Sequence, residues 1–185
     1  MTGHVRRRVT RPALLAILLA ATAAACTTKS APTPVPPTAR HMITNQGHRL
    51  AFYVTPGHLP AIVLDSGGGL DASYWKNLVP TLATATGSEI VTYDRAGLGA
   101  SDEIPGPWKP EDAVSDLDTG LRQLGLTRRV ILVSHSEAGE IATYFVREHP
   151  GIVEAAMLVD ATRRSFTPTT RSLESWPRRG HRSVR

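Results

Sequence analysis

The chain has 185 residues, a net charge of +5 and one cysteine, Cys26. A single cysteine excludes an internal disulfide framework and any metal site built from several thiolates. The excess positive charge lies at the ends: residues 1–40 hold six Lys or Arg and no acid, and residues 161–185 hold seven Arg and one Glu. Residues 41–160 hold eight basic and fifteen acidic residues. Because a nucleic-acid partner requires a basic face on the folded domain, we expect none.

Residues 1–26 have the pattern of an export signal. Arginines precede a short apolar run over 13–25, which is too short to span a membrane comfortably. Cys26 follows three alanines and resembles the lipoprotein box of bacterial envelope proteins, whose cysteine is lipidated. The alternative is an ordinary signal peptide with an incidental cysteine. We expect the protein in the cell envelope or outside the cell, with a lipid on Cys26 as its one link to the membrane.

The next segment, residues 27–40, is rich in Pro and Thr and predicts an extended linker. Residues 41–160 then alternate short apolar runs with amphipathic helical patterns. The runs predict strands at 61–65, 90–94, 130–133 and 156–160, and the patterns predict helices over 110–124 and from Ala138 onward. This alternation predicts an α/β fold: a mostly parallel sheet with helices on both faces. Ligands of such sheets bind beyond the carboxyl ends of the strands.

A serine follows the third of these strands at a tight turn. Strand, turn on Ser136 and helix is the order of a nucleophile elbow, although Ser134 and Ala138 stand where that motif has glycine. The alternative is an ordinary β–α turn in which serines cap the helix.

Four motifs occur in a familiar order along the chain. They are SGGG at 66–69, YDRAGLGASD at 93–102, SHSEAG at 134–139 and MLVDA at 157–161. Together they resemble the serine-nucleophile members of the α/β-hydrolase superfamily over about residues 43–163. The resemblance implies a partial α/β-hydrolase fold, with residues 42–54 as its N-terminal β-hairpin.

The resemblance also implies roles for single residues. Ser136 would attack a carboxylic ester or related small acyl substrate and form an acyl-enzyme. The backbone N–H groups of Gly68 and Glu137 would bind the oxyanion. We expect the Glu137 side chain to point into solvent, where the helix dipole favours an acid. Neither a cofactor nor a metal is implied.

The base and acid that such a serine requires are harder to find. His135 is expected to be a packing residue, because adjacent side chains diverge. His149 is expected at the far end of the elbow helix, and His181 lies in the basic tail. Asp160, after the last predicted strand, is the remaining acid at the correct end of the sheet. The alternative function is therefore a catalytically inactive remnant or a binding lipoprotein that lacks the acid–histidine pair.

Residues 161–185 are rich in Arg and have no apolar periodicity, which predicts disorder. The resemblance implies two further strands at this point. We expect a truncated or frame-disrupted copy of a hydrolase; the alternative is a natural short protein that borrows the missing groups from a partner. Either way, the last strand would be an exposed sheet edge, which predicts poor solubility.

Overall fold

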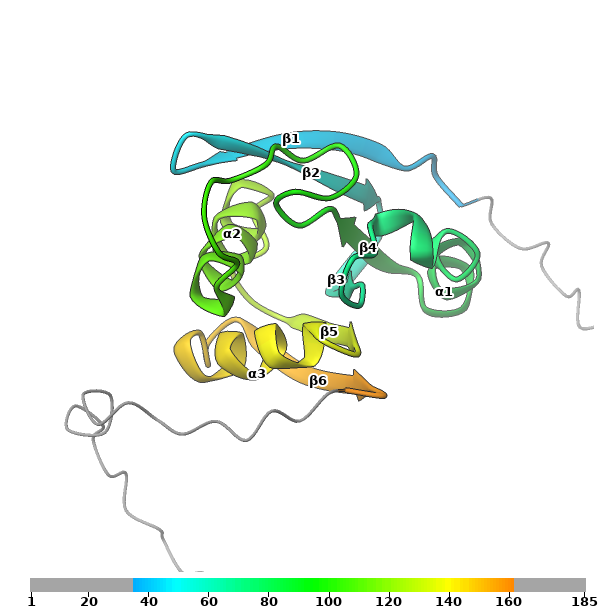
Figure 1. Ribbon diagram of the computed structural model, residues 1–185. Coiled ribbons are helices and arrows are strands. Elements are labelled where there is room, and N and C mark those ends of the chain that lie inside the picture. Colours follow the sequence, from blue (N-terminus) through cyan, green and yellow to red (C-terminus); the bar gives the residue numbers. More distant parts are fainter. Residues whose placement is uncertain (1–34, 162–185) are drawn as a thin grey trace, which may run out of the picture. The chain divides into compact units, whose positions relative to one another are not determined.

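The structure is a computed structural model, and it describes residues 35–161 (Figure 1). Six strands alternate with helices along this part of the chain. The strands are β1 (Ala39–Asn45), β2 (His48–Thr55), β3 (His58–Asp65), β4 (Ser88–Tyr93), β5 (Val130–His135) and β6 (Val153–Val159). The helices are α1 (Val79–Thr86), α2 (Pro110–Gln123) and α3 (Ala138–Glu148), and a short 3₁₀ turn, η1, covers Ala72–Trp75.

The strands form one sheet in the order β1-β2-β4-β3-β5-β6. The pairs β1–β2 and β2–β4 are antiparallel, and the other three pairs are parallel. The predicted N-terminal hairpin is confirmed: β1 and β2 are joined by Gln46 and Gly47, both with positive φ, which is the backbone of the tight turns that match strand twist. Strand β1 begins at Ala39, two residues before the predicted start of the domain.

Helices cover both faces of the sheet, as predicted. Figure 1 shows α2 and α3 on one side and α1 on the other. The larger core lies under α2 and α3, where Leu117 and Leu121 of α2 are fully buried near the stacked rings of Phe52 and Tyr93, 5.0 Å apart. Burial of each such side chain stabilises the fold by roughly 1.5–3 kcal/mol. The smaller core lies under α1 around Trp75 and Ile90.

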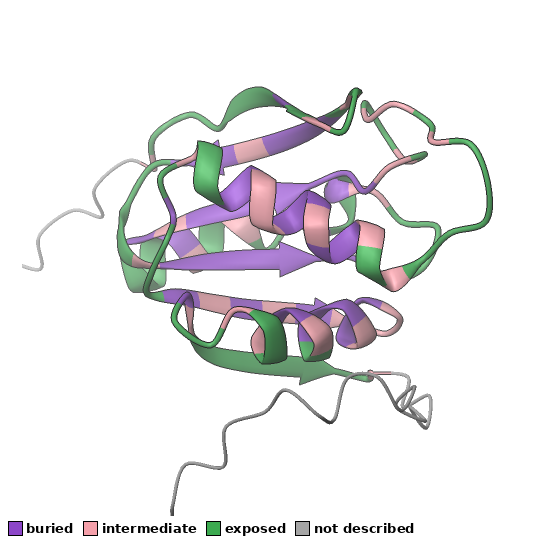
Figure 2. Cartoon of the chain, turned by 90° about the vertical axis from the view of Figure 1, so that its left-hand side faces the viewer, coloured by how far each residue is buried: buried purple, intermediate pink, exposed green. Residues whose placement is uncertain are grey.

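The outer strand β6 differs from the rest of the sheet. All of its residues but the first are exposed, and Figure 2 shows it as the exposed lowest strand. Met157, Leu158 and Val159 are 60%, 49% and 39% exposed. Successive residues of a strand face opposite sides of the sheet, so β6 presents apolar side chains on both faces.

Parallel strands β3, β4, β5 and β6 end at the same edge of the sheet. The glycine-rich loop after β3, the YDRAGLGASD turn after β4, Ser136 after β5 and Asp160 after β6 all begin at this edge. The fold therefore gathers the predicted functional segments at one place.

Candidate active site

Ser136 occupies a sharp turn between β5 and α3. Its φ is +52°, in the left-handed region that a non-glycine residue rarely adopts. Its amide donates a hydrogen bond of 3.0 Å to the carbonyl oxygen of Val159, and its own carbonyl accepts one of 3.0 Å from Gly139. Strain of this kind persists only where the surroundings fix it and is concentrated at functional sites. The turn has the geometry of a nucleophile elbow.

Small buried residues stand at the two positions where the elbow motif normally has glycine. Ser134 and Ala138 are buried at the two positions that would hold glycine. The close approach occurs instead at Gly139, where an added methyl carbon would lie 2.5 Å from Cβ of Ala161. On the helix side of the serine, the position that requires glycine is therefore residue 139 and not residue 138.

The glycine-rich loop after β3 lies against the elbow. A methyl carbon added to Gly67 would lie 3.3 Å from Cβ of Ser136 and 2.8 Å from Nδ1 of His135. One added to Gly68 would lie 2.5 Å from Oε2 of Glu137. The structure thus brings together Ser136, Gly68 and Glu137, the three residues predicted to form the nucleophile and the oxyanion donors.

The expected orientation of the Glu137 side chain is wrong. The side chain turns toward the glycine-rich loop, where its carboxylate packs over Gly68, and the residue is half-buried. A glycine at position 68 leaves open the space that this carboxylate occupies. The sequence signal for this contact is an acid directly after the predicted nucleophile, together with a loop of glycines that leaves room for its side chain.

A buried charge network holds the loop in place. Arg95 Nη1 lies 2.7 Å from Asp65 Oδ1, and the Tyr93 hydroxyl donates to the other oxygen of Asp65 at 2.7 Å. Arg95 also donates to the carbonyl oxygens of Ser66 and, at 2.6 Å, Gly67. Burial raises the pKa of Asp65 to about 6, although Arg95 and Tyr93 oppose that shift. The YDRAGLGASD motif contains Tyr93 and Arg95, but its pattern carries no signal that these side chains support the glycine-rich loop.

Asp94 links the same loop to the turn after β4. Its carboxylate accepts hydrogen bonds from the amides of Ala72 and Ala100, each at 2.8 Å, and from the hydroxyl of Tyr53 at 3.0 Å. A side chain at Gly99 would collide with this carboxylate. Asp94 is therefore a structural residue, because its oxygens are fully engaged by backbone and hydroxyl donors.

His135 is a packing residue, as expected. Its ring stacks on Tyr74 with centroids 5.0 Å apart and meets Trp75 edge-on at 6.5 Å. Its Nδ1 is buried beneath Gly67, and it has no hydrogen-bond partner among residues 35–161. The ring thus packs between the glycine-rich loop and Tyr74.

Of the other acid–base candidates, Asp160 is the one whose backbone lies beside the elbow, because it follows Val159, whose carbonyl oxygen accepts the hydrogen bond from the Ser136 amide. Asp160 is exposed after β6 and has a φ of +47°. His149 is at the opposite end of α3 from the serine, as expected, where Nδ1 lies 3.5 Å from Asp118 Oδ1 and the ring packs on Phe145. His181 and Cys26 lie outside the described residues.

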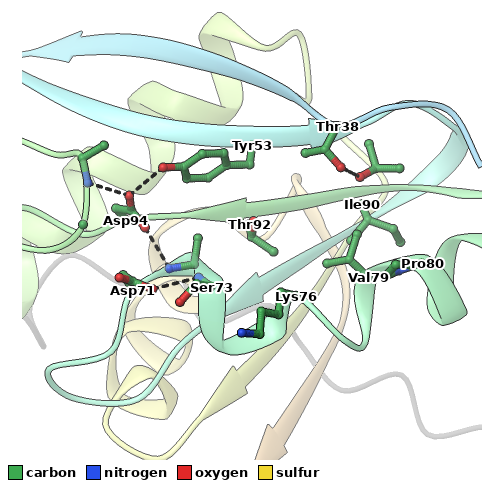
Figure 3. A pocket seen from close by; sticks show the side chains of 14 residues that line it. Thr38, Tyr53, Asp71, Ser73, Lys76, Val79, Pro80, Ile90, Thr92 and Asp94 are labelled. Carbon is green, nitrogen blue, oxygen red and sulfur yellow. Dashed lines mark hydrogen bonds between the residues drawn. The ribbon is translucent and has the colours of Figure 1, made fainter.

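A separate cavity of about 540 Å³ lies on the α1 side of the sheet (Figure 3). Tyr53 and Thr92 line it from strands, Val79 from α1, and Lys76 from the end of η1. Ser136 is not among its lining residues. Within residues 35–161 no three His, Cys, Asp or Glu side chains are grouped to hold a metal ion, and no helix is long and apolar enough to cross a membrane.

Known proteins share this architecture. The model of the Alpha/beta hydrolase family matches residues 62–184. The chain is 32% identical to the mouse (Mus musculus) sn-1-specific diacylglycerol lipase ABHD11 over 110 residues, which cover 60% of this chain and 35% of that protein. It is 27% identical to a soluble epoxide hydrolase of Corynebacterium sp. over 120 residues, 65% of this chain and 41% of that one.

Solved structures of other proteins superpose on this fold. A thermophilic esterase from Thermogutta terrifontis superposes with a TM-score of 0.62 at 28% identity, covering 70% of this chain and 48% of the esterase. The epoxide hydrolase CorEH gives the same score at 22% identity, covering 68% and 43%, and shows the fold alone. The chain spans 35–41% of the length of the curated relatives it matches. From its sheet order, its elbow and the family match, this chain belongs to the alpha/beta hydrolase family.

Proposed function

We propose that the protein is a serine hydrolase that cleaves small carboxylic esters or related acyl compounds. The observation that carries the proposal is the strained turn at Ser136, with the backbone of Gly67 and Gly68 lying against it. A serine on such a turn is exposed to a substrate carbonyl, and nearby amides are available to an oxyanion. The esterase and the diacylglycerol lipase named above fit this substrate class.

The reaction would proceed in two steps. Ser136 Oγ bonds to the carbonyl carbon, the carbonyl electrons move onto the oxyanion beside Gly68 and Glu137 N–H, and the ester C–O bond breaks as the alcohol leaves with the serine's proton. Water then attacks the acyl-enzyme, releases the carboxylic acid and returns a proton to the serine. Both steps require a base. We propose that the carboxylate of Asp160 orients this base.

Fluorophosphonate labelling of the full chain tests this proposal, because these probes react only with an activated serine. We expect labelling of the native chain, none of Ser136→Gly, and undiminished labelling of Ser73→Ala. Glycine suits the positive φ at position 136, so that variant keeps the turn while removing the hydroxyl. If a chain with native circular dichroism is not labelled, the protein keeps the fold without the chemistry, which is the inactive-remnant or binding-protein alternative.

We also propose that residues 1–26 export the chain and that Cys26 carries the lipid. The arginines, the apolar run and the alanines before Cys26 support this. Expression in a bacterium with radiolabelled palmitate should give a labelled protein in the membrane fraction. Cys26→Ser should lose the label and leave the membrane. A labelled Cys26→Ser chain, or an unlabelled native chain, would contradict the anchor.

A further inference from the structure

The Glu137 side chain places a carboxylate at the mouth of the proposed site. Its Oε2 occupies the position next to Gly68 that a side chain at residue 68 would fill, and its Cδ lies 3.3 Å from that point. The neighbouring residue of the same loop, Gly67, lies against Ser136, so the carboxylate rests on the loop that would bind the oxyanion. Its charge is therefore close to the reacting carbonyl.

No cation of residues 35–161 neutralises this carboxylate. Glu137 is absent from the ion pairs of that region. The neighbouring guanidinium of Arg95 is already paired with Asp65 and bound to loop carbonyls. The charge of Glu137 also adds to burial in raising the pKa of Asp65. Among residues 35–161, these two carboxylates and one guanidinium thus leave one negative charge without an ion-pair partner at this corner of the site.

An unpaired carboxylate disfavours a neutral substrate. As the carbonyl oxygen becomes negative, the two like charges repel each other at short range and raise the barrier. A cation on the substrate removes this penalty. Since the carboxylate is adjacent to the reacting carbonyl, the cation would need to lie on the carbon attached to it.

We propose that Glu137 is a specificity residue that selects acyl groups with an ammonium on the carbon next to the scissile carbonyl, as in α-aminoacyl esters. This inference rests on the proposed function, because it takes Ser136 as the nucleophile. The ammonium pairs with Glu137 while the carbonyl oxygen faces the amides of Gly68 and Glu137. Glycine at position 68 is required because a side chain there would displace the carboxylate.

Equilibrium binding to full-length Ser136→Gly tests the selection without turnover. Leucine ethyl ester, with its amine protonated, is compared with ethyl 4-methylpentanoate, which has the same skeleton without the amine. We expect about tenfold tighter binding of the cationic ester in an NMR titration, equivalent to 1.4 kcal/mol. Adding Glu137→Gln should abolish this preference. Adding Glu140→Gln, which removes an acid from the same helix turn, should preserve it.

Two outcomes overturn the inference: equal affinity for the two esters, or a preference that survives Glu137→Gln. An equal gain for both esters in Glu137→Gln would also overturn it, since the carboxylate would then only repel ligands. Fluorophosphonate labelling separates this result from the proposed function. Labelling without a charge preference refutes the inference alone, and a charge preference without labelling refutes acyl transfer alone.

Discussion

Single residues set the shape of the site. Asp65 and Arg95 are 3% and 6% exposed, and their ion pair lies directly beneath the loop carbonyls. Charges this deeply buried are costly unless they are paired. The pair is therefore a sensitive point, because removing one partner leaves the other without compensation.

We predict that Asp65→Ala lowers the free energy of unfolding by about 3 kcal/mol, because the buried Arg95 guanidinium and the Tyr93 hydroxyl both lose their acceptor. Urea unfolding of the full chain followed by circular dichroism would measure this loss. Glu154→Ala is the matched control. It breaks the half-exposed pair with Arg129 and should cost under about 1 kcal/mol. Equal effects of the two substitutions would contradict the role of burial.

The same carboxyl predicts a pH dependence. Its folded-state pKa, about 6, is above its ordinary value of 3.8, so the folded state binds more protons between these limits. The contribution of Asp65 is complete below about 4 and is lost as the pH rises through about 6. Unfolding measured across this window should show that decline for the native chain. Asp65→Asn should lack this part of the decline.

At the scale of elements, the sheet and its covering helices follow from local patterns. The apolar runs predicted the strands, and Pro110 with the apolar face of residues 110–124 predicted α2, which ends one residue earlier at Gln123. The elbow was predictable because strand, serine and helix are contiguous. The Asp65–Arg95–Tyr93 network was not predictable, since it joins residues from different strands whose contacts depend on register.

The helix–sheet contact at Gly120 carries a prediction that runs against helix propensity. Gly→Ala within a helix normally stabilises it by roughly 0.5–1 kcal/mol. Here an added methyl would collide with the ring of Phe52, which stacks on Tyr93. We predict that Gly120→Ala destabilises the protein by about 1–3 kcal/mol in urea unfolding. Phe52→Leu in the same chain should recover part of the loss; if the two losses merely add, steric overlap is not the cause.

In the turn between β1 and β2, a substitution is expected to stabilise the protein. Gln46 has a φ of +46° and stands at the first position of a two-residue turn, where Asn is favoured. We predict that Gln46→Asn raises the free energy of unfolding by a few tenths of a kcal/mol, the scale of gain expected from a better backbone match. Gly47→Ala, at a φ of +90°, should lower it. Thermal unfolding measures both, and a loss with Gln46→Asn would contradict this account of the turn.

At the scale of the molecule, the two edges of the sheet differ. Strand β1 is exposed and carries polar residues such as Arg40 and Thr44. Strand β6 is exposed and almost entirely apolar, and in the described part of the chain nothing pairs with its outer side. An apolar, unpaired edge promotes association with other chains. The resemblance implied this edge by placing further strands after β6, and the burial values now identify its residues.

We predict that the purified chain self-associates through β6 in a concentration-dependent way. Met157→Lys should reduce this association, because a lysine on an edge strand opposes pairing. Met42→Lys makes the same change on the other edge strand, at a residue 41% exposed, and should have little effect. Analytical ultracentrifugation across a dilution series measures both variants. Equal effects would show that the association does not run through β6.

The hydrogen bond from the Ser136 amide to the carbonyl oxygen of Val159 ties the serine's turn to the last residue of this same strand. The most exposed strand of the described sheet is thus the one to which the Ser136 turn is hydrogen-bonded. A neighbour that stiffens β6 from outside would limit the freedom of the serine from within, and fraying of β6 would release it. The backbone conformation of Ser136 is in this sense held by the edge strand of the sheet.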